Sequence, residues 1–234
     1  MDLKGTEITW LGHGTFSFKT SEDKTVLVDP WVMNNPGCPD ELKNPEQIDL
    51  ILITHAHFDH IGDAVELARK HEPQTFAIFE TAMWLGSKDV PNVTGMNIGG
   101  TAAAEGVGFT MVNAIHSCGI TDGDQILYGG EAAGYVIRFP GGLRVYYAGD
   151  TAVFGDMRII AELYEPDVCV LPIGDFYTMS PREAAYAVKL LGAKTVIPMH
   201  FGTFPVLTGT PDELSKLVGD QAEIVAMKPG ETLR

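Results

Sequence analysis

The feature that most constrains this chain is the segment THAHFDH at residues 54–60, which directly follows the apolar run Asp49–Ile53. A short apolar run of this kind predicts a buried β-strand. Three histidines and an aspartate lie within the seven residues after it. A strand that only fills a core does not need so many groups able to bind metal, so its end is a candidate site.

The spacing inside this segment indicates how its side chains could be divided between metal ions. His55 and His57 are one residue apart at a strand exit, where alternate side chains lie on the same side, so both imidazoles can reach one ion. Asp59 and His60 enter the helix that follows and approach from a different direction. Four such ligands can serve two adjacent ions. The alternative is a polar loop that caps this helix through Asp59.

Three more metal-binding residues, His116, Asp150 and His200, each directly follow a run that predicts a strand. A single histidine at a strand end is more often a hydrogen-bonded structural group, and Asp150 alone would suit a turn or a helix cap. In α/β proteins, however, ligands gather outside the carboxyl ends of the strands. Three such residues at three strand ends therefore support one another as members of one site.

Hydrophobic periodicity predicts two halves of similar order, each with strands first and helices later. The clearest helix start is Ser180-Pro181-Arg182-Glu183, with Ser as N-cap, and Gly192 predicts the end of that helix. This order fits two sheets packed face to face with helices outside. The predicted strands include Glu7–Leu11, Thr15–Lys19, Thr25–Asp29, Asp49–Ile53, Phe76–Phe79, Tyr135–Phe139, Leu143–Tyr147, Val168–Leu171, Thr195–Ile197 and Ile224–Met227.

Composition limits the classes of protein that this chain can be. Its 234 residues, 45% of them hydrophobic, suffice for one core. The three cysteines form no CxxC pair, which disfavours a disulfide framework and a cysteine zinc site. A net charge of -15 opposes nucleic-acid binding and favours a small-molecule substrate. Without a cationic leader or an apolar stretch of about 20 residues, we expect a cytoplasmic protein without membrane association. The sequence is also compatible with a homo-oligomer.

The segment THAHFDH resembles the HxHxDH signature of the metallo-β-lactamase superfamily, and His116, Asp150 and His200 occur in the order of that superfamily's remaining ligands. The resemblance covers essentially the whole chain. Four further segments are similar to uncharacterised bacterial and archaeal metal-dependent hydrolases near the ascorbate-6-phosphate lactonase branch. These segments are WLGHG at 10–14, YAGDT at 147–151, GDFYTM at 174–179 and PMH at 198–200.

The resemblance implies an α/β fold of the α+β type, a four-layered αββα sandwich formed by one hydrolase domain over residues 1–234. It also implies a binuclear metal centre at one edge of the sheets. The ligands carried over position by position are His55, His57 and His116 for the first ion, Asp59, His60 and His200 for the second, and Asp150 between them. Imidazole and carboxylate ligands without thiolate suit zinc, which we favour, and also manganese, iron or nickel.

Such a centre implies hydrolysis. Two ions about 3.5 to 4 Å apart acidify a bridging water to hydroxide and polarise a carbonyl or phosphoryl oxygen. We expect a small ester-type substrate, a phosphoester or a lactone, with Asp59 and His13 as candidate catalytic residues. In the resembling branch the histidine at the position of His13 lies near the metals, so a role in binding a substrate anion or supporting a ligand competes with a core hydrogen bond.

Departures from other members of the superfamily narrow this expectation. Some class B β-lactamases have a cysteine at the position of Asp150 and are exported, and this sequence shows neither feature. Flavodiiron oxidoreductases replace the second histidine of the motif by glutamate and carry a flavin domain, whereas this chain keeps His57 and ends at Arg234. Two alternatives stay open: a metal-binding or sensing protein without turnover, and a nuclease-type phosphodiesterase.

Several other residues have both a structural and a functional interpretation. Asp175 could accept a hydrogen bond from a ligand histidine and Tyr177 could contact substrate, against a role in a turn. His71 is expected at a helix C-terminus, where it favours the helix dipole. Cys118 has no base paired with it, which disfavours a catalytic thiol. The stretch Gly119–Gly134, with five glycines, is either a mobile lid or a long hairpin connection.

Overall fold

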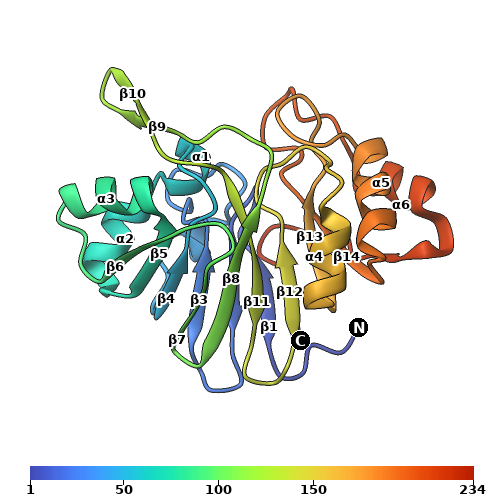
Figure 1. The fold of residues 1–234 in the computed structure, drawn as a ribbon, viewed down its shortest axis with the longest axis horizontal. Coiled ribbons are helices and arrows are strands. Elements are labelled where there is room, and N and C mark those ends of the chain that lie inside the picture. Colours follow the sequence, from blue (N-terminus) through green and yellow to red (C-terminus); the bar gives the residue numbers. More distant parts are fainter.

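The computed structural model describes residues 1–234, and two seven-stranded mixed sheets packed face to face form its centre (Figure 1). Helices α1 to α3 lie beside the first sheet, and α4 to α6 cover the outer side of the second (Figure 1). The architecture confirms the expected four-layered αββα sandwich. No helix combines the length and the apolar character needed to cross a membrane.

The first sheet has the strand order β16-β1-β2-β3-β4-β5-β6. Its strands are β1 (Glu7–Trp10), β2 (Phe16–Lys19), β3 (Thr25–Val28), β4 (Leu50–Leu52), β5 (Gln74–Ile78), β6 (Val93–Met96) and β16 (Thr232–Leu233). Strands β1 to β3 alternate in direction, and β3 to β6 are parallel. The carboxyl ends of β1, β3 and β4 therefore lie at the same edge of this sheet.

The second sheet has the strand order β15-β14-β13-β12-β11-β8-β7. Its strands are β7 (Thr101–Ala104), β8 (Val107–Asn113), β11 (Ala133–Arg138), β12 (Arg144–Tyr147), β13 (Val168–Pro172), β14 (Thr195–Met199) and β15 (Glu223–Ile224). Strands β12 to β15 are parallel, and β11 is antiparallel to both β8 and β12. Hence β8, β12 and β14 also end at one common edge.

Six α-helices accompany the two sheets. They are α1 (Phe58–Ile61), α2 (Ala64–His71), α3 (Phe79–Ser87), α4 (Met157–Tyr164), α5 (Pro181–Leu191) and α6 (Pro211–Val218). At the start of α5, Ser180 Oγ accepts a hydrogen bond from Glu183 N, and Glu183 Oε2 accepts one from Ser180 N at 2.9 Å. Such a capping box stabilises a helix by about 1 kcal/mol. Gly192 ends α5 with φ 56°, a left-handed conformation that glycine adopts without strain.

Alternation along the strands of the second sheet separates two apolar layers. Val168 and Val170 of β13 face the core between the sheets, whereas Cys169 and Leu171 face the layer under α4, α5 and α6. This period of two is the geometry of a pleated strand. Because both faces are buried, the run reads as continuously apolar and the sheet must be covered on both sides.

The stretch Gly119–Gly134 forms a hairpin that projects from the body (Figure 1). Its strands are β9 (Gly119–Asp122) and β10 (Gln125–Tyr128). Asp122 fixes the hairpin to α3, because its carboxylate accepts hydrogen bonds from Trp84 Nε1 at 3.0 Å and Lys88 Nζ at 2.9 Å. Of the two interpretations of this glycine-rich stretch, the structure agrees with the hairpin connection.

Some boundaries differ from the predicted ones. Phe79 is the first residue of α3 and not the end of a strand. The last predicted strand covers Ile224–Met227, whereas the observed strand covers only Glu223–Ile224. This strand lies at the edge of its sheet and therefore pairs with a neighbour on one side only. All three cysteines are buried free thiols, which confirms that the chain has no disulfide framework.

Candidate metal centre

The candidate ligands follow strands whose carboxyl ends face each other across the two sheets. From the first sheet come residues after β1, β3 and β4, and from the second come residues after β8, β12 and β14. The residues concerned are His13, Asp29 and His55 in the first set and His116, Asp150 and His200 in the second. The strand-end residues singled out in the sequence are thus brought together.

His55, His57 and His116 form one group, in which one nitrogen of each ring lies within 4.8 Å of the others. His57 Nδ1 lies 3.1 Å from His55 Nε2 and 3.2 Å from His116 Nε2. His57 is also the residue before α1, and His55 lies two residues nearer to β4. The alternate spacing therefore turns both imidazoles to the same side, and His116 meets them from the opposite sheet.

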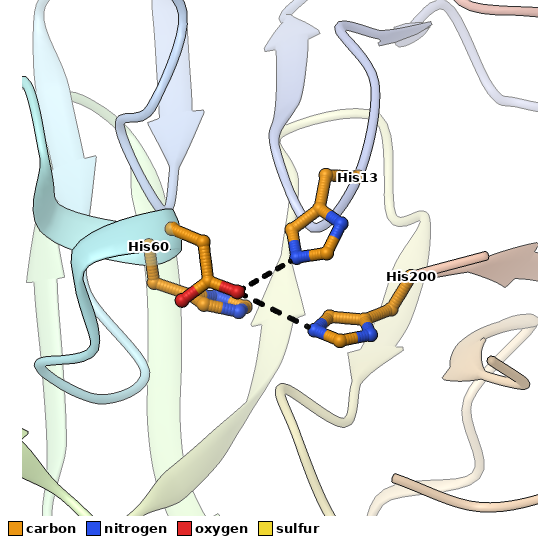
Figure 2. A group of neighbouring side chains, drawn as sticks. His13, His60 and His200 are labelled. Atoms are coloured by element: carbon orange, nitrogen blue, oxygen red, sulfur yellow. Dashed lines mark hydrogen bonds and ion pairs between the residues drawn. The ribbon is translucent and has the colours of Figure 1, made fainter. Parts of the chain in front are cut away.

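A second group consists of His13, Asp59, His60 and His200, and one ligand atom of each lies within 4.8 Å of the others. Figure 2 shows the three histidines turned toward one another, with His60 on α1. Asp59 Oδ2 lies 2.9 Å from His13 Nε2 and 3.8 Å from His200 Nε2. Asp59 makes no capping hydrogen bond to α1, so its carboxylate belongs to this group and not to the helix end.

Asp150 lies between the two groups and is almost fully buried. Its Oδ2 is 3.8 Å from His55 Nε2 and 3.6 Å from His116 Nε2, both in the first group. The same oxygen is 3.0 Å from His200 Nε2, and Oδ1 is 3.4 Å from His60 Nε2, both in the second group. One carboxylate therefore faces imidazoles from both sides.

The hydrogen bonding of these atoms tests whether the site fits divalent metal. His60 Nε2, His200 Nε2 and Asp150 Oδ1 are buried, and despite their close approach none makes a hydrogen bond. Buried polar atoms are nearly always hydrogen-bonded, so three such atoms beside one another require another partner. Imidazole nitrogens and a carboxylate oxygen are together a donor set for zinc, manganese, iron or nickel. The residues therefore fit a metal centre.

Asp29 is a member of the site that the sequence prediction missed. This fully buried aspartate follows β3 and accepts hydrogen bonds from Thr54 N at 2.8 Å, Thr54 Oγ1 at 2.7 Å and His60 Nδ1 at 2.8 Å. A carboxylate on Nδ1 keeps that nitrogen protonated and leaves the lone pair of Nε2 facing the site. Asp29 stands at a strand end as Asp150 does, and applying the same criterion to it would have found it.

Burial and charge act in opposite directions on the central groups. Burial lowers the pKa of His55 well below its usual range, so its ring is neutral. Burial also opposes the charge on Asp150, but the neighbouring His200 and His60 outweigh it and hold the pKa well below the usual range. For His60, likewise, burial is outweighed by Asp150 and Asp29, which raise the pKa. Asp150 is thus ionised among its imidazoles.

His13 has a partner on each ring nitrogen. Nε2 contacts Asp59 Oδ2 at 2.9 Å, and Nδ1 lies 3.0 Å from Thr203 Oγ1. Burial and the nearby His200 lower the pKa of His13 to about 4, so the ring is neutral. Burial alone would raise the pKa of Asp59, but the hydrogen bond from His13 and the charge of His60 lower it to about 2. With both nitrogens occupied, His13 offers no free donor to a substrate anion.

A cavity of about 640 Å³ opens over the site, and members of both groups line it together with Asp150, namely His57, His116, Asp59 and His200. Its walls are Phe58, Tyr177, Phe204, Pro205 and Val206. The size is typical of sites that bind small molecules. Tyr177, a candidate for contact with substrate, is thus one of the lining residues.

Three other residues with two interpretations have structural roles. Asp175 is exposed and accepts a hydrogen bond from Phe176 N, so it acts in a turn and contacts no ligand histidine. Burial raises the pKa of the Cys118 thiol, whose Sγ lies 3.2 Å from Gly129 O, so it is not a nucleophilic thiolate. His71 is the last residue of α2, as expected.

The fold and the site together define a metal-dependent hydrolase of the αββα type, and comparisons with known proteins agree. The family model described as the beta-lactamase superfamily domain matches residues 24–201. A UPF0173 metal-dependent hydrolase of Koribacter versatilis is 57% identical over 232 residues, 99% of each chain. A relative of the same name from Solibacter usitatus is 52% identical and covers 97% of this chain and 99% of its own.

A solved structure is also similar. Igni18, a metallo hydrolase from Ignicoccus hospitalis, is 39% identical, with a TM-score of 0.85 and 97% coverage of both chains. The chain therefore belongs to the metallo-β-lactamase superfamily, among its metal-dependent hydrolases. This confirms the resemblance that the THAHFDH segment carries.

Proposed function

We propose that this hydrolase uses two divalent metal ions to cleave a small ester-type substrate, a lactone or a phosphoester. In this proposal each of the two groups binds one ion and Asp150 contacts both, with zinc favoured. The proposed ligands are His55, His57 and His116 for one ion and Asp59, His60 and His200 for the other.

The observation that carries this proposal is the position of Asp150. A carboxylate that served one ion would face one group of imidazoles, whereas Asp150 Oδ2 lies within 3.8 Å of His55 and 3.0 Å of His200, which belong to different groups. Its other oxygen is buried without a hydrogen bond. A single buried carboxylate with imidazoles on both sides suits a pair of cations that share one ligand.

When bound, such a pair would acidify a water molecule near neutral pH and polarise the oxygen of the scissile group. The chain's own contribution is orientation. Asp29 holds the tautomer of His60, and His13 Nε2 holds Asp59 Oδ2, the same oxygen that lies 3.8 Å from His200 Nε2. We assign Asp59 a direct role at the reacting centre. His13 acts through Asp59 as a positioning residue, because both its nitrogens are engaged.

The test combines metal content with turnover. The purified protein would be loaded separately with zinc and with manganese, and bound metal would be counted by inductively coupled plasma mass spectrometry. Initial rates would then be measured on phosphodiester, phosphomonoester, lactone, carboxylic ester and thioester substrates. We expect two ions per chain and turnover of at least one of these classes.

Asp150→Asn is the informative variant, and His71→Gln is its control because His71 lies at the end of α2, outside the site. Loss of the shared carboxylate is expected to lower metal affinity by at least about 10- to 100-fold, as removal of groups that support ligands does. Turnover should fall with it, while the control keeps both. Wild-type rates in Asp150→Asn would contradict the proposal. Two bound ions without turnover of any class would favour the metal-binding or sensing alternative.

A further inference from the structure

We propose that the site selects a carboxylic ester or lactone whose non-reacting part is uncharged and apolar, and that it discriminates against substrates with an additional anionic group. This inference rests on the proposed hydrolase function and narrows its substrate class. Three features of the cavity carry it: the absence of cationic side chains, an aromatic wall beside the ligands, and exposed apolar side chains at the mouth.

No lysine or arginine lines the cavity. The segments that follow the site-facing strand ends and form the surroundings of the cavity contain neither residue type, although the chain has 16 of them. These segments are 11–15, 29–37, 54–62, 113–118, 148–156, 173–180 and 200–210. A terminal phosphate or carboxylate on a substrate is normally bound by such side chains, above all by the planar fork of arginine. Beyond the metal ions, an extra anionic group would find no cationic partner here.

The electrostatic field of the whole protein also disfavours anionic substrates. The net charge is -15, and Asp175 adds an exposed carboxylate two residues from the cavity wall at Tyr177. A surface of one sign lowers the local concentration of solutes of the same sign. Anionic substrates are therefore repelled on approach and unpaired once bound.

An aromatic cluster forms one wall of the cavity. Trp31, Phe58 and Phe204 lie with ring centroids 5.9 to 6.4 Å apart. Trp31 is buried, whereas Phe58 is 56% exposed at the cavity. The rings of Trp31 and Phe204 also lie 5.3 and 5.5 Å from the ring of His13, which is one of the histidines in Figure 2. This packing fixes an apolar surface directly beside the second group of ligands.

The mouth of the cavity continues this apolar surface. Tyr177 and Val206 line it and are exposed, with Pro205 next to Val206. Each methylene group that a substrate buries there contributes about 0.8 kcal/mol, which corresponds to about a fourfold change in affinity. A short alkyl chain would therefore gain more from this wall than any polar substituent could.

A matched pair of substrates tests the inference. Hexanoate p-nitrophenyl ester and the mono-p-nitrophenyl ester of adipate have acyl chains of the same length, and only the second ends in a carboxylate. With the metal-loaded protein we expect kcat/KM to be at least tenfold higher for the neutral ester. It should also rise about fourfold per methylene from acetate to hexanoate. An adipate ester cleaved within threefold of the hexanoate ester would overturn the inference.

A charge placed in the wall should weaken or abolish this preference. Val206→Lys puts a cation at the mouth, and Ile159→Lys adds the same charge at an exposed position of α4, outside the cavity. We expect Val206→Lys to raise the ratio of adipate to hexanoate kcat/KM at least tenfold and Ile159→Lys to leave it unchanged. If both variants give the wild-type ratio, the cavity does not set the charge preference and the inference fails.

A binding measurement separates failure of the inference from failure of the proposed function. Fluorescence titrations of the metal-loaded protein would compare the neutral dye N-phenyl-1-naphthylamine with the anionic 8-anilino-1-naphthalenesulfonate. We expect the neutral dye to bind at least tenfold more tightly than the anionic dye. This difference in affinity should be smaller in Val206→Lys and unchanged in Ile159→Lys. This pattern without turnover of any substrate class would refute the hydrolase proposal and leave standing only the preference of the cavity for uncharged, apolar ligands. Ester turnover with equal binding of both dyes would support the hydrolase proposal and refute the inference.

Discussion

Replacing Asp29 by asparagine tests how the site controls the protonation of its ligands. The change keeps the size of the side chain, and asparagine tolerates the left-handed backbone at this position, where φ is 53°. It replaces one of the two accepting oxygens by an NH₂ group, however. Because the carboxylate accepts three hydrogen bonds from Thr54 and His60, no orientation of the amide can keep them all.

The two orientations of the amide fail in different ways. If the NH₂ replaces Oδ2, it faces His60 Nδ1, and that nitrogen must become an acceptor. The proton then resides on Nε2, whose lone pair is lost to the site, and metal affinity should fall by about 10- to 100-fold. If the NH₂ replaces Oδ1, the buried N–H of Thr54 loses its acceptor, which costs about 1–3 kcal/mol. Either way the variant is weakened at the metal centre or in the fold.

Competition with a chromophoric chelator would give the zinc affinity, and urea unfolding in the presence of a chelator would give the stability of the fold. Asp63→Asn is the matched control. Asp63 is a buried carboxylate that accepts hydrogen bonds from Val32 N at 2.6 Å and Met33 N at 2.8 Å and touches no histidine. The control should lose about 1 kcal/mol of stability and keep its zinc affinity. Equal zinc affinity and equal stability in both variants would refute the role given to Asp29.

Three further predictions concern single residues. His116→Gln should lower bound zinc from two ions to about one per chain, as counted by mass spectrometry, because it removes one ligand from the first group only; two retained ions would contradict that grouping. Cys118→Ser should keep kcat within about threefold in the ester assay, since its buried thiol is not a nucleophile. Hydrogen bonds from Thr25 N and Lys24 lower the pKa of Asp49 against the effect of burial, so its contribution exists above the unfolded pKa and is lost as pH falls through the lower folded value. Asp49→Asn should therefore lose about 2 kcal/mol at pH 7 in urea unfolding, and this loss should begin to shrink only below about pH 4, as pH falls toward the lowered pKa of Asp49; a loss independent of pH would count against this account.

Features with local causes were predicted well. Ser180, Glu183 and Gly192 specify both ends of α5 by contacts within a few residues, and the structure has them as expected. The positions of His55, His116 and His200 were predictable because each comes just after an apolar run, so that its place at a sheet edge needs only the direction of its own strand. His55 and His57 are the clearest case, since their spacing alone puts both rings on one side.

Features that depend on distant partners were not predictable in the same way. The strand-end criterion would have found Asp29 itself, but not its partners Thr54 and His60, which lie 25 and 31 residues away in the sequence, where Asp29-Pro30 resembles a turn. Strand β16 has two residues and exists only because Thr232 and Leu233 pair with β1 across almost the whole chain. The hairpin of β9 and β10 likewise depends on the contact between Asp122 and α3. A glycine-rich stretch does not indicate such a contact in the sequence.

The centre also has a consequence for the energetics of the fold, because its residues come from both sheets. His60 Nε2, His200 Nε2 and Asp150 Oδ1 are buried without hydrogen bonds, and each such atom destabilises a fold by about 1–3 kcal/mol. Apolar side chains of similar size would pack at this edge at lower cost, yet they would bind nothing. A sequence selected for stability alone would not keep these atoms. These atoms lie where the two sheets present their strand ends to each other. Their presence there indicates that this edge of the sheets binds metal.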